Sequence, residues 1–111
     1  MSKIERIDTS KAPGAVGPYS QAMATENLIY TSGQLGINPA DKSMPEGVRE
    51  QAILSLSNVK AVLEAAGTGM DKVLKATVFL TEMSDFAVVN EIYADFFSEP
   101  YPARSCFAVK A

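Results

Sequence analysis

The longest regular pattern in the chain is a series of apolar residues at helical spacing between positions 48 and 66. They recur three or four positions apart, as one face of an amphipathic helix requires; they are Val48, Ala52, Ile53, Leu56, Val59, Val62, Leu63 and Ala66. Gly67 and Gly69 follow directly, and glycine adopts the left-handed conformation in which many helices end. The pattern predicts a helix over 48–66 that stops at Gly67.

A second helix is predicted over 84–97. Ser84 is a suitable N-cap residue, and the prolines at positions 100 and 102 prevent the helix from continuing. Its apolar stripe consists of Phe86, Val89, Tyr93, Phe96 and Phe97. Asn90 falls within the same stripe, and a buried amide needs hydrogen-bond partners. Asn90 therefore either ties the helix to a nearby loop or forms part of a pocket wall.

Five segments have the composition or alternation of β-strands; they cover residues 3–9, 21–25, 28–35, 73–81 and 103–109. The polar pair Glu26-Asn27 separates the second segment from the third and predicts a hairpin. Residues 38–47 contain two prolines and three charged residues, which is typical of a surface loop.

The order of these elements predicts an α/β protein in which a mixed sheet carries both helices on one face. The other face of the sheet is then bare. If Phe79 and its neighbours occupy that face, association of copies would bury it, and each fully buried large apolar side chain contributes roughly 1.5–3 kcal/mol. We therefore expect a closed homo-oligomer.

Composition limits the chemistry that this chain can perform. Its 111 residues correspond to one domain, 1–111. The absence of histidine excludes a Ser-His-Asp triad, a Cys-His dyad and a histidine-ligated zinc site, and a single cysteine excludes internal disulfides and thiolate metal clusters. A net charge of −3 and a pI of about 4.9 argue against a nucleic-acid partner. With no leader-like segment or membrane-length apolar run, we expect a soluble cytoplasmic protein.

Arg104 lies in the middle of the last predicted strand, where alternation places it on one face with Cys106 and puts Ser105, Phe107 and Val109 on the other. We expect the Phe107 face to meet the helices, which leaves Arg104 on the bare face. A guanidinium removed from water needs an anion. That anion is either a ligand carboxylate, which suits the planar fork, or one of the 13 acidic side chains of the chain itself.

Three further positions have plausible chemical roles. Cys106 is more typical of a small core residue than of a nucleophile, because no histidine is present to deprotonate it. Tyr19 follows a rigid Gly-Pro loop, and Gly33, next to Ser32, permits close approach of the backbone. Both are candidate pocket edges, although Tyr19 can simply pack and Gly33 can mark a bulge.

Taken together, four segments resemble the Rid family, the RidA or YjgF-like reactive intermediate deaminases. The resemblance covers nearly the whole chain, and it implies a chorismate-mutase-like α/β fold of the bacillus type. It also implies a homotrimer with pockets between subunits, and hydrolysis of 2-aminoacrylate and related enamine or imine acids to 2-keto acids and ammonia without a cofactor. The segments are Gly17-Pro18-Tyr19-Ser20-Gln21, Thr31-Ser32-Gly33-Gln34, Asp85-Phe86 through Asn90 to Tyr93, and Tyr101-Pro102-Ala103-Arg104-Ser105-Cys106.

The resemblance assigns roles to matching positions. The carboxylate-binding arginine of the family falls on Arg104, its pocket cysteine on Cys106 and its pocket tyrosine on Tyr19. Further pocket positions fall on Ser32, Gly33 and Asn90. In the family, a later strand carries a glutamate that is thought to assist the water, and the sequence ends at Ala111 before that strand. We expect that the molecule continues past Ala111 or is truncated; an intact mass of 11.9 kDa with full activity would contradict this.

Two other functions stay open at this point. The same pocket in a regulatory module would bind small carboxylates such as 2-oxobutanoate without turnover. Some family members are described as endoribonucleases or translation inhibitors, but the lack of histidine and the acidic pI count against RNA cleavage here.

Overall fold

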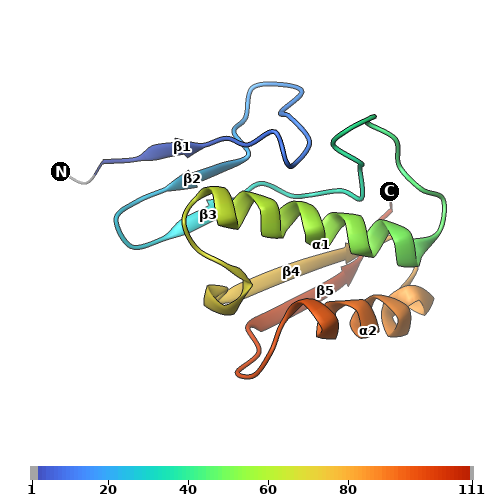
Figure 1. The fold of residues 1–111 in the computed structure, drawn as a ribbon. Coiled ribbons are helices and arrows are strands. Elements are labelled where there is room, and N and C mark those ends of the chain that lie inside the picture. Colours follow the sequence, from blue (N-terminus) through green and yellow to red (C-terminus); the bar gives the residue numbers. More distant parts are fainter. Residues whose placement is uncertain (1–2, 111) are drawn as a thin grey trace.

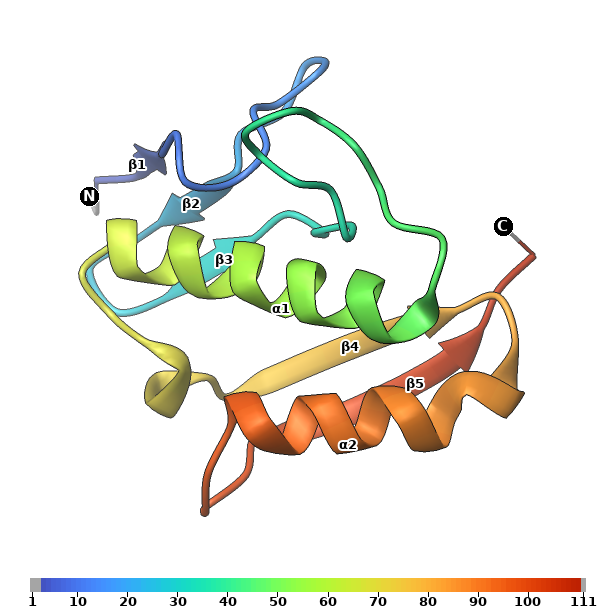
Figure 2. The ribbon, with the colours of Figure 1, turned by 45° about the vertical axis from the view of Figure 1, so that its right-hand side comes forward.

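The computed structural model describes residues 3–110 and places two long helices on one side of five strands (Figure 1). The elements in chain order are β1 (Glu5–Ile7), β2 (Ala22–Ala24), β3 (Ile29–Thr31), α1 (Val48–Ala65), the short 3₁₀ helix η1 (Met70–Lys72), β4 (Lys75–Leu80), the 3₁₀ helix η2 (Met83–Asp85), α2 (Phe86–Phe96) and β5 (Ala103–Ala108). The predicted α/β class, with both helices on the same side, is confirmed (Figure 2).

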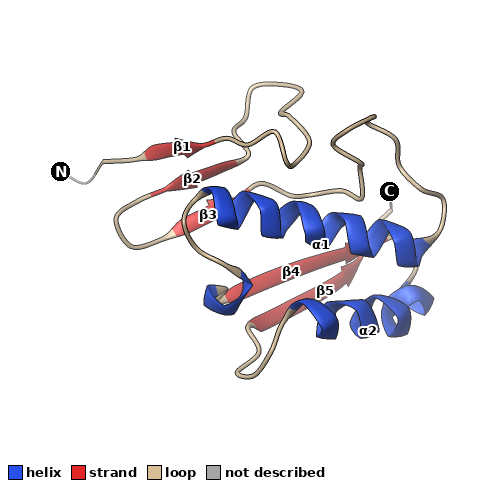
Figure 3. Ribbon diagram, in the orientation of Figure 1, coloured by secondary structure: helices blue, strands red, loops and turns tan. Residues whose placement is uncertain are grey.

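The strands pair as two separate sheets and not as one continuous five-stranded sheet. Strands β1, β2 and β3 form an antiparallel sheet, and β4 and β5 form a parallel pair (Figure 3). The predicted hairpin is the β2–β3 connection. The strands of the first sheet, with three residues each, are shorter than the apolar patterns indicated.

Helix α1 ends as the glycine predicted. Gly67 has a φ of 84°, which is the left-handed region that favours glycine. Its N–H donates to the carbonyl of Glu64, and the N–H of Thr68 donates to the carbonyl of Leu63, both at 3.0 Å. This pair of bonds is the Schellman motif, and it satisfies carbonyls that the last helical turn leaves free.

Helix α2 begins later than predicted. Ser84 lies inside η2, and Asp85 occupies the N-cap position without a side-chain capping bond. The N–H of Asp85 donates to the carbonyl of Glu82 at 3.0 Å, so the 3₁₀ turn itself leads the backbone into the helix. The prediction of Ser84 as the N-cap residue is therefore wrong.

Two buried amides fix the loops that follow β1 and β3. Gln21 is 2% exposed and bonds the backbone of Thr9, Ala12 and Pro13. Asn58 of α1, also 2% exposed, donates to the carbonyls of the loop after β3, at Leu35 and Ile37. These bonds hold the connecting segments against the α1 layer, where the core cluster of Ala12, Ala22 and Val62 lies.

The parallel register of β4 and β5 decides which face each side chain takes. Phe79 lies beside Phe107, Ala76 beside Arg104 and Val78 beside Cys106. The Phe79 and Phe107 rings stack with centroids 6.2 Å apart and are 64% and 53% exposed. Both phenylalanines therefore lie on the open face, and Arg104 and Cys106 lie on the side of the helices.

The prediction that Phe107 faces the helices and Arg104 the bare face is wrong. Alternation along β5 separates these two residues but does not say which of them faces the helices. Pairing with β4 supplies that information. Phe79, the β4 neighbour of Phe107, is exposed, whereas Leu80, the next residue of β4, is buried, so the Phe79 and Phe107 face is the open one.

The open face continues across the first sheet. Met23 pairs with Tyr30, and they are 36% and 70% exposed. Their strand neighbours Ala22 and Ile29 belong to the cluster under α1, so Met23 and Tyr30 point the other way. Apolar side chains of both sheets thus remain exposed on the side away from the helices.

Within residues 3–110, no helix is long and apolar enough to cross a membrane.

Candidate active site

The guanidinium of Arg104 is held by three side chains of α2. Its Nη1 donates to Oδ1 of Asn90 at 2.7 Å. The carbon Cζ lies 4.7 Å from the ring centroid of Tyr93 and 5.4 Å from that of Phe86. Both distances fall within the range of cation–π attraction. Arg104 itself is exposed, so the held guanidinium faces solvent.

Within the described residues 3–110, no acidic side chain pairs with this guanidinium. Among residues 3–110, the one ion pair within 4.0 Å joins Arg49 of α1 to Glu91 of α2, at 3.4 Å between two exposed side chains. Arg104 therefore has a hydrogen-bonded, uncompensated positive charge in the described part of the chain. Of the two interpretations left open by the sequence, an internal ion pair is excluded for these residues and an anionic ligand remains.

Asn90 has a different partner from the loop that the sequence suggested. Asn90 is exposed, and its amide oxygen accepts a hydrogen bond from the side chain of Arg104 on β5. Cys106 lies two residues further along β5 on the same face and is a half-buried free thiol. The structure therefore brings together three predicted site residues, Arg104, Asn90 and Cys106.

Tyr93 is the titratable group in contact with Arg104. Burial raises the pKa of its phenol above the ordinary value, while the positive charge of Arg104 acts in the opposite direction. Its hydroxyl is buried and has no hydrogen-bond partner in the part of the chain that the structure describes. Tyr93 also packs against Phe97, with ring centroids 4.4 Å apart. The phenol thus stays neutral and protonated around neutral pH.

The other predicted site residues form a second group on the three-stranded sheet. Ser32 follows β3; its hydroxyl donates to the carbonyl of Ser20 at 2.6 Å, and its N–H donates to the carbonyl of Gln21 at 2.9 Å. Tyr19, the neighbour of Ser20, is 49% exposed. Gly33 is exposed, with open space where a Cβ would lie. The Ser32 hydroxyl joins the two segments of this group.

The two groups lie apart in a single chain. Arg104 and Cys106 belong to β5, whereas Tyr19, Ser32 and Gly33 flank β2 and β3 of the other sheet. In Figure 1, β4 lies between β3 and β5. Within residues 3–110, no hydrogen bond connects one group to the other. One copy of the chain therefore does not assemble all six predicted residues into one pocket.

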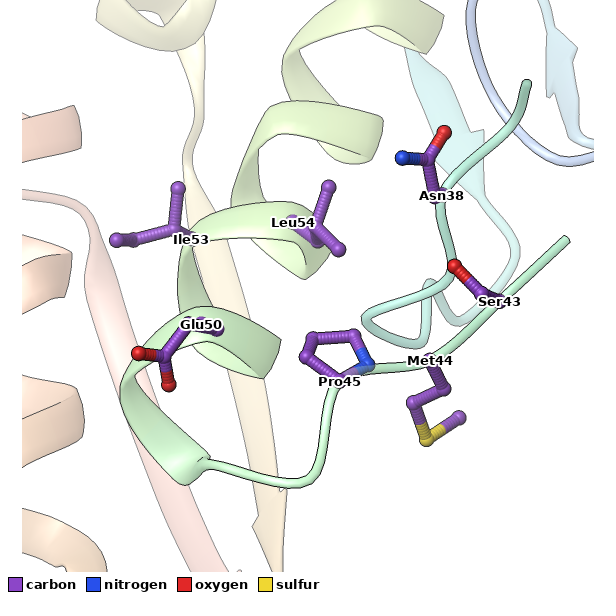
Figure 4. A pocket seen from close by; sticks show the side chains of 7 residues that line it. All are labelled: Asn38, Ser43, Met44, Pro45, Glu50, Ile53 and Leu54. Atoms are coloured by element: carbon purple, nitrogen blue, oxygen red, sulfur yellow. The ribbon is translucent and has the colours of Figure 1, made fainter. Parts of the chain in front are cut away.

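Two open hollows on the described surface lie away from both groups. One open hollow of about 400 Å³ lies between the loop before α1 and the first turns of that helix (Figure 4). Another, of about 500 Å³, lies along the loop after β1. Neither is lined by any of the six predicted residues. In the described residues, no group of three or more acidic or cysteine side chains is placed to hold a metal ion.

Sequence reasoning missed the aromatic contacts of Arg104. Phe86 and Tyr93 were assigned to the apolar stripe of α2 as core residues, yet both rings also contact the guanidinium. The signal was the amide of Asn90 between them, because positions 86, 90 and 93 share one helix face. A polar residue within an aromatic stripe requires a polar partner, but the sequence does not show on which element that partner lies.

Comparisons with known proteins agree with this arrangement. The family model described as Endoribonuclease L-PSP matches residues 9–111. The 2-iminobutanoate/2-iminopropanoate deaminase of Homo sapiens is 45% identical over 114 residues, covering 100% of this chain and 83% of the relative.

Two solved structures have the same fold. RidA from the Antarctic bacterium Psychrobacter sp. PAMC 21119 superposes with a TM-score of 0.94 at 48% identity, covering 96% of this chain and 87% of that one. Escherichia coli TdcF with bound serine superposes with a TM-score of 0.91 at 42% identity, covering 96% and 86%. The chain therefore belongs to the Endoribonuclease L-PSP family, the Rid-type reactive intermediate deaminases, and has their chorismate-mutase-like α/β fold.

Proposed function

We propose that this protein hydrolyses 2-aminoacrylate, 2-iminopropanoate and related imine acids to 2-keto acids and ammonia. The observation that carries the proposal is the positioned, uncompensated guanidinium of Arg104. Relatives at 45% identity and above support the reaction class, because they are named deaminases of 2-imino acids.

Arg104 binds the substrate carboxylate. A guanidinium has five N–H donors, and the bond to Asn90 uses one of them. The remaining donors can pair with both oxygens of a carboxylate in a bidentate arrangement, which is the geometry for which arginine is suited. Small imino acids have such a carboxylate next to the reacting carbon, so holding it also places that carbon.

The chemical step needs little catalytic assistance from the protein. The enamine 2-aminoacrylate first takes a proton from solvent on its terminal carbon and becomes protonated 2-iminopropanoate. The carbon of a protonated imine is electrophilic; a water oxygen adds to it, and the carbinolamine that forms breaks its C–N bond. The nitrogen leaves as ammonia with protons supplied by the water, and the carbon retains the oxygen as a keto group. Orientation of the water and the substrate then dominates the rate. Within the proposed pocket, the Tyr19 hydroxyl and groups near Cys106 orient the water and the departing amine, and Ser32 and Gly33 line the wall.

The proposal places the complete pocket between copies of the chain in a homotrimer. In one copy the Arg104 group and the Tyr19 group lie on different sheets. The open face that would join copies carries exposed Met23, Tyr30, Phe79 and Phe107, and closed symmetric association would bury it. A bound serine in the related TdcF structure supports a small amino-acid-like ligand.

A cytoplasmic location belongs to the proposal, since a free thiol at Cys106 persists in reducing surroundings.

The test is hydrolysis of freshly generated 2-aminoacrylate by wild-type protein, Arg104→Ala and Arg104→Lys, corrected for the reaction in water. Losing one partner of a charge pair costs about 2–5 kcal/mol, so we expect kcat/KM to fall by roughly 30-fold or more in Arg104→Ala. The lysine variant should retain part of the activity as a point charge. Arg49→Ala is the matched control, because that arginine is paired with Glu91 on the surface.

Unchanged turnover in Arg104→Ala would refute the proposal. A different outcome would select the second candidate, a regulatory module. In that case, calorimetry would show binding of 2-oxobutanoate that depends on Arg104, while wild-type protein would not accelerate imine hydrolysis.

A further inference from the structure

The stripe Phe86, Asn90 and Tyr93 on α2 has a role that the assignment of Asn90 to a pocket wall does not describe. We infer that this stripe is a neutral cradle that positions the guanidinium of Arg104 and leaves its whole charge available to the ligand. This inference rests on the proposed function and deepens it, because it assigns positioning residues for the carboxylate-binding group.

The cradle restrains the guanidinium through three contacts. Asn90 Oδ1 accepts a hydrogen bond from Nη1 at 2.7 Å. The rings of Tyr93 and Phe86 approach Cζ at 4.7 and 5.4 Å. Their positions, four and three residues apart, put all three on one face of α2 beside β5. A long side chain that would otherwise sample many rotamers is thereby held in place although it faces solvent.

The cradle contains no formal charge. An aspartate or glutamate at the position of Asn90 would hold Nη1 equally well, but it would cancel the charge that a carboxylate ligand needs. An amide oxygen and two aromatic faces attract a cation through dipoles and quadrupoles instead. In residues 3–110, Arg104 has no carboxylate within 4.0 Å, whereas Arg49 on the same side of the molecule is ion-paired. Neutrality therefore distinguishes the binding arginine from the structural one.

The discriminating variant is Asn90→Asp, which keeps the shape and the acceptor but adds a negative charge. We expect it to keep Arg104 in place and to weaken the binding of 2-oxobutanoate, measured by calorimetry, by roughly tenfold or more. The same amide-to-carboxylate change at Asn27, in the exposed β2–β3 turn, is the matched control and should leave binding unchanged. Asn90→Leu and Phe86→Leu should raise KM for the imino acid roughly tenfold with a smaller change in kcat.

Nuclear magnetic resonance of the arginine side chains tests positioning without reference to activity. The two Nη groups give separate signals when rotation of the guanidinium is restrained and one averaged signal when it is free. The chain has three arginines, so Arg104→Lys identifies the signal of Arg104. We expect separate Nη signals in wild-type protein and Asn90→Asp, and an averaged signal in Asn90→Leu.

The outcomes separate this inference from the proposed function. An averaged signal in wild-type protein, separate signals in Asn90→Leu, or wild-type affinity for 2-oxobutanoate in Asn90→Asp would each overturn the neutral cradle. If instead wild-type protein neither binds 2-oxobutanoate nor hydrolyses imines while the signals behave as expected, the positioning role stands and the proposed function fails.

Discussion

Replacing Phe107 by serine tests whether the open face of the strands joins copies of the chain and thereby completes the site. Phe107 is 53% exposed and stacks on Phe79 in that face. A phenylalanine side chain presents about 200 Å², so about 100 Å² remains to be buried by a partner. At about 25 cal/mol per Å², the loss is about 2.5 kcal/mol for each copy, or roughly 70-fold per copy in the association constant.

Sedimentation velocity over a range of concentrations measures the association, and imine hydrolysis at the same concentrations measures the site. We expect Phe107→Ser to dissociate at concentrations at which the wild-type protein stays assembled. Turnover should fall in proportion, because the Arg104 and Tyr19 groups would separate. The folded chain should survive, since the replaced side chain is mostly exposed; far-ultraviolet circular dichroism checks this. Leu28→Ser, a similar change in the exposed β2–β3 turn, is the matched control.

Two results would refute this reasoning. If Phe107→Ser sediments like the wild-type protein at every concentration, the open face is not the contact between copies. If the variant is monomeric and fully active, the site is complete within one chain and the two groups of residues do not need a partner.

Three further changes test the packing around the site. Asn58→Leu leaves two loop carbonyls without donors, and at about 1–3 kcal/mol for each we expect a loss of about 2–6 kcal/mol in the free energy of unfolding by urea; an unchanged midpoint would contradict this. Gly36→Ala forces a Cβ against the backbone of Gln51 and should cost about 1–3 kcal/mol, whereas Gly14→Ala, where the Cβ meets open space, should change stability by less than about 1 kcal/mol. Tyr93→Phe removes a buried hydroxyl without a partner and should raise the free energy of unfolding by about 1 kcal/mol. Burial raises the folded-state pKa of Tyr93 above its unfolded value of 10.0, so above that pH the unfolded chain loses this proton before the folded protein does. The free energy of unfolding of the wild-type protein should therefore fall as the pH rises from the unfolded pKa through the folded-state pKa, and Tyr93→Phe should lack this loss; equal alkaline losses in the two proteins would count against it.

The local pattern of the sequence was sufficient for most of the secondary structure. Helical spacing and Gly67 determined α1 and its end, because both depend on contacts within a few residues. The same holds for the α2 stripe and for the two long strands β4 and β5. Composition alone excluded mechanisms that depend on a histidine. Four segments taken together, the one around Arg104 among them, indicated the family, which the comparisons confirm.

The tertiary structure decided which way the functional side chains point. The sequence shows that Arg104 and Phe107 take opposite faces of β5, but only the in-register pairing of Phe107 with Phe79 shows that Arg104 faces α2. The partner of Asn90 was also undetermined, since it lies 14 residues away on another element. Periodicity along a strand or helix records relative direction within one element. The absolute direction depends on which elements pack together, and that is a property of contacts between residues distant in the chain.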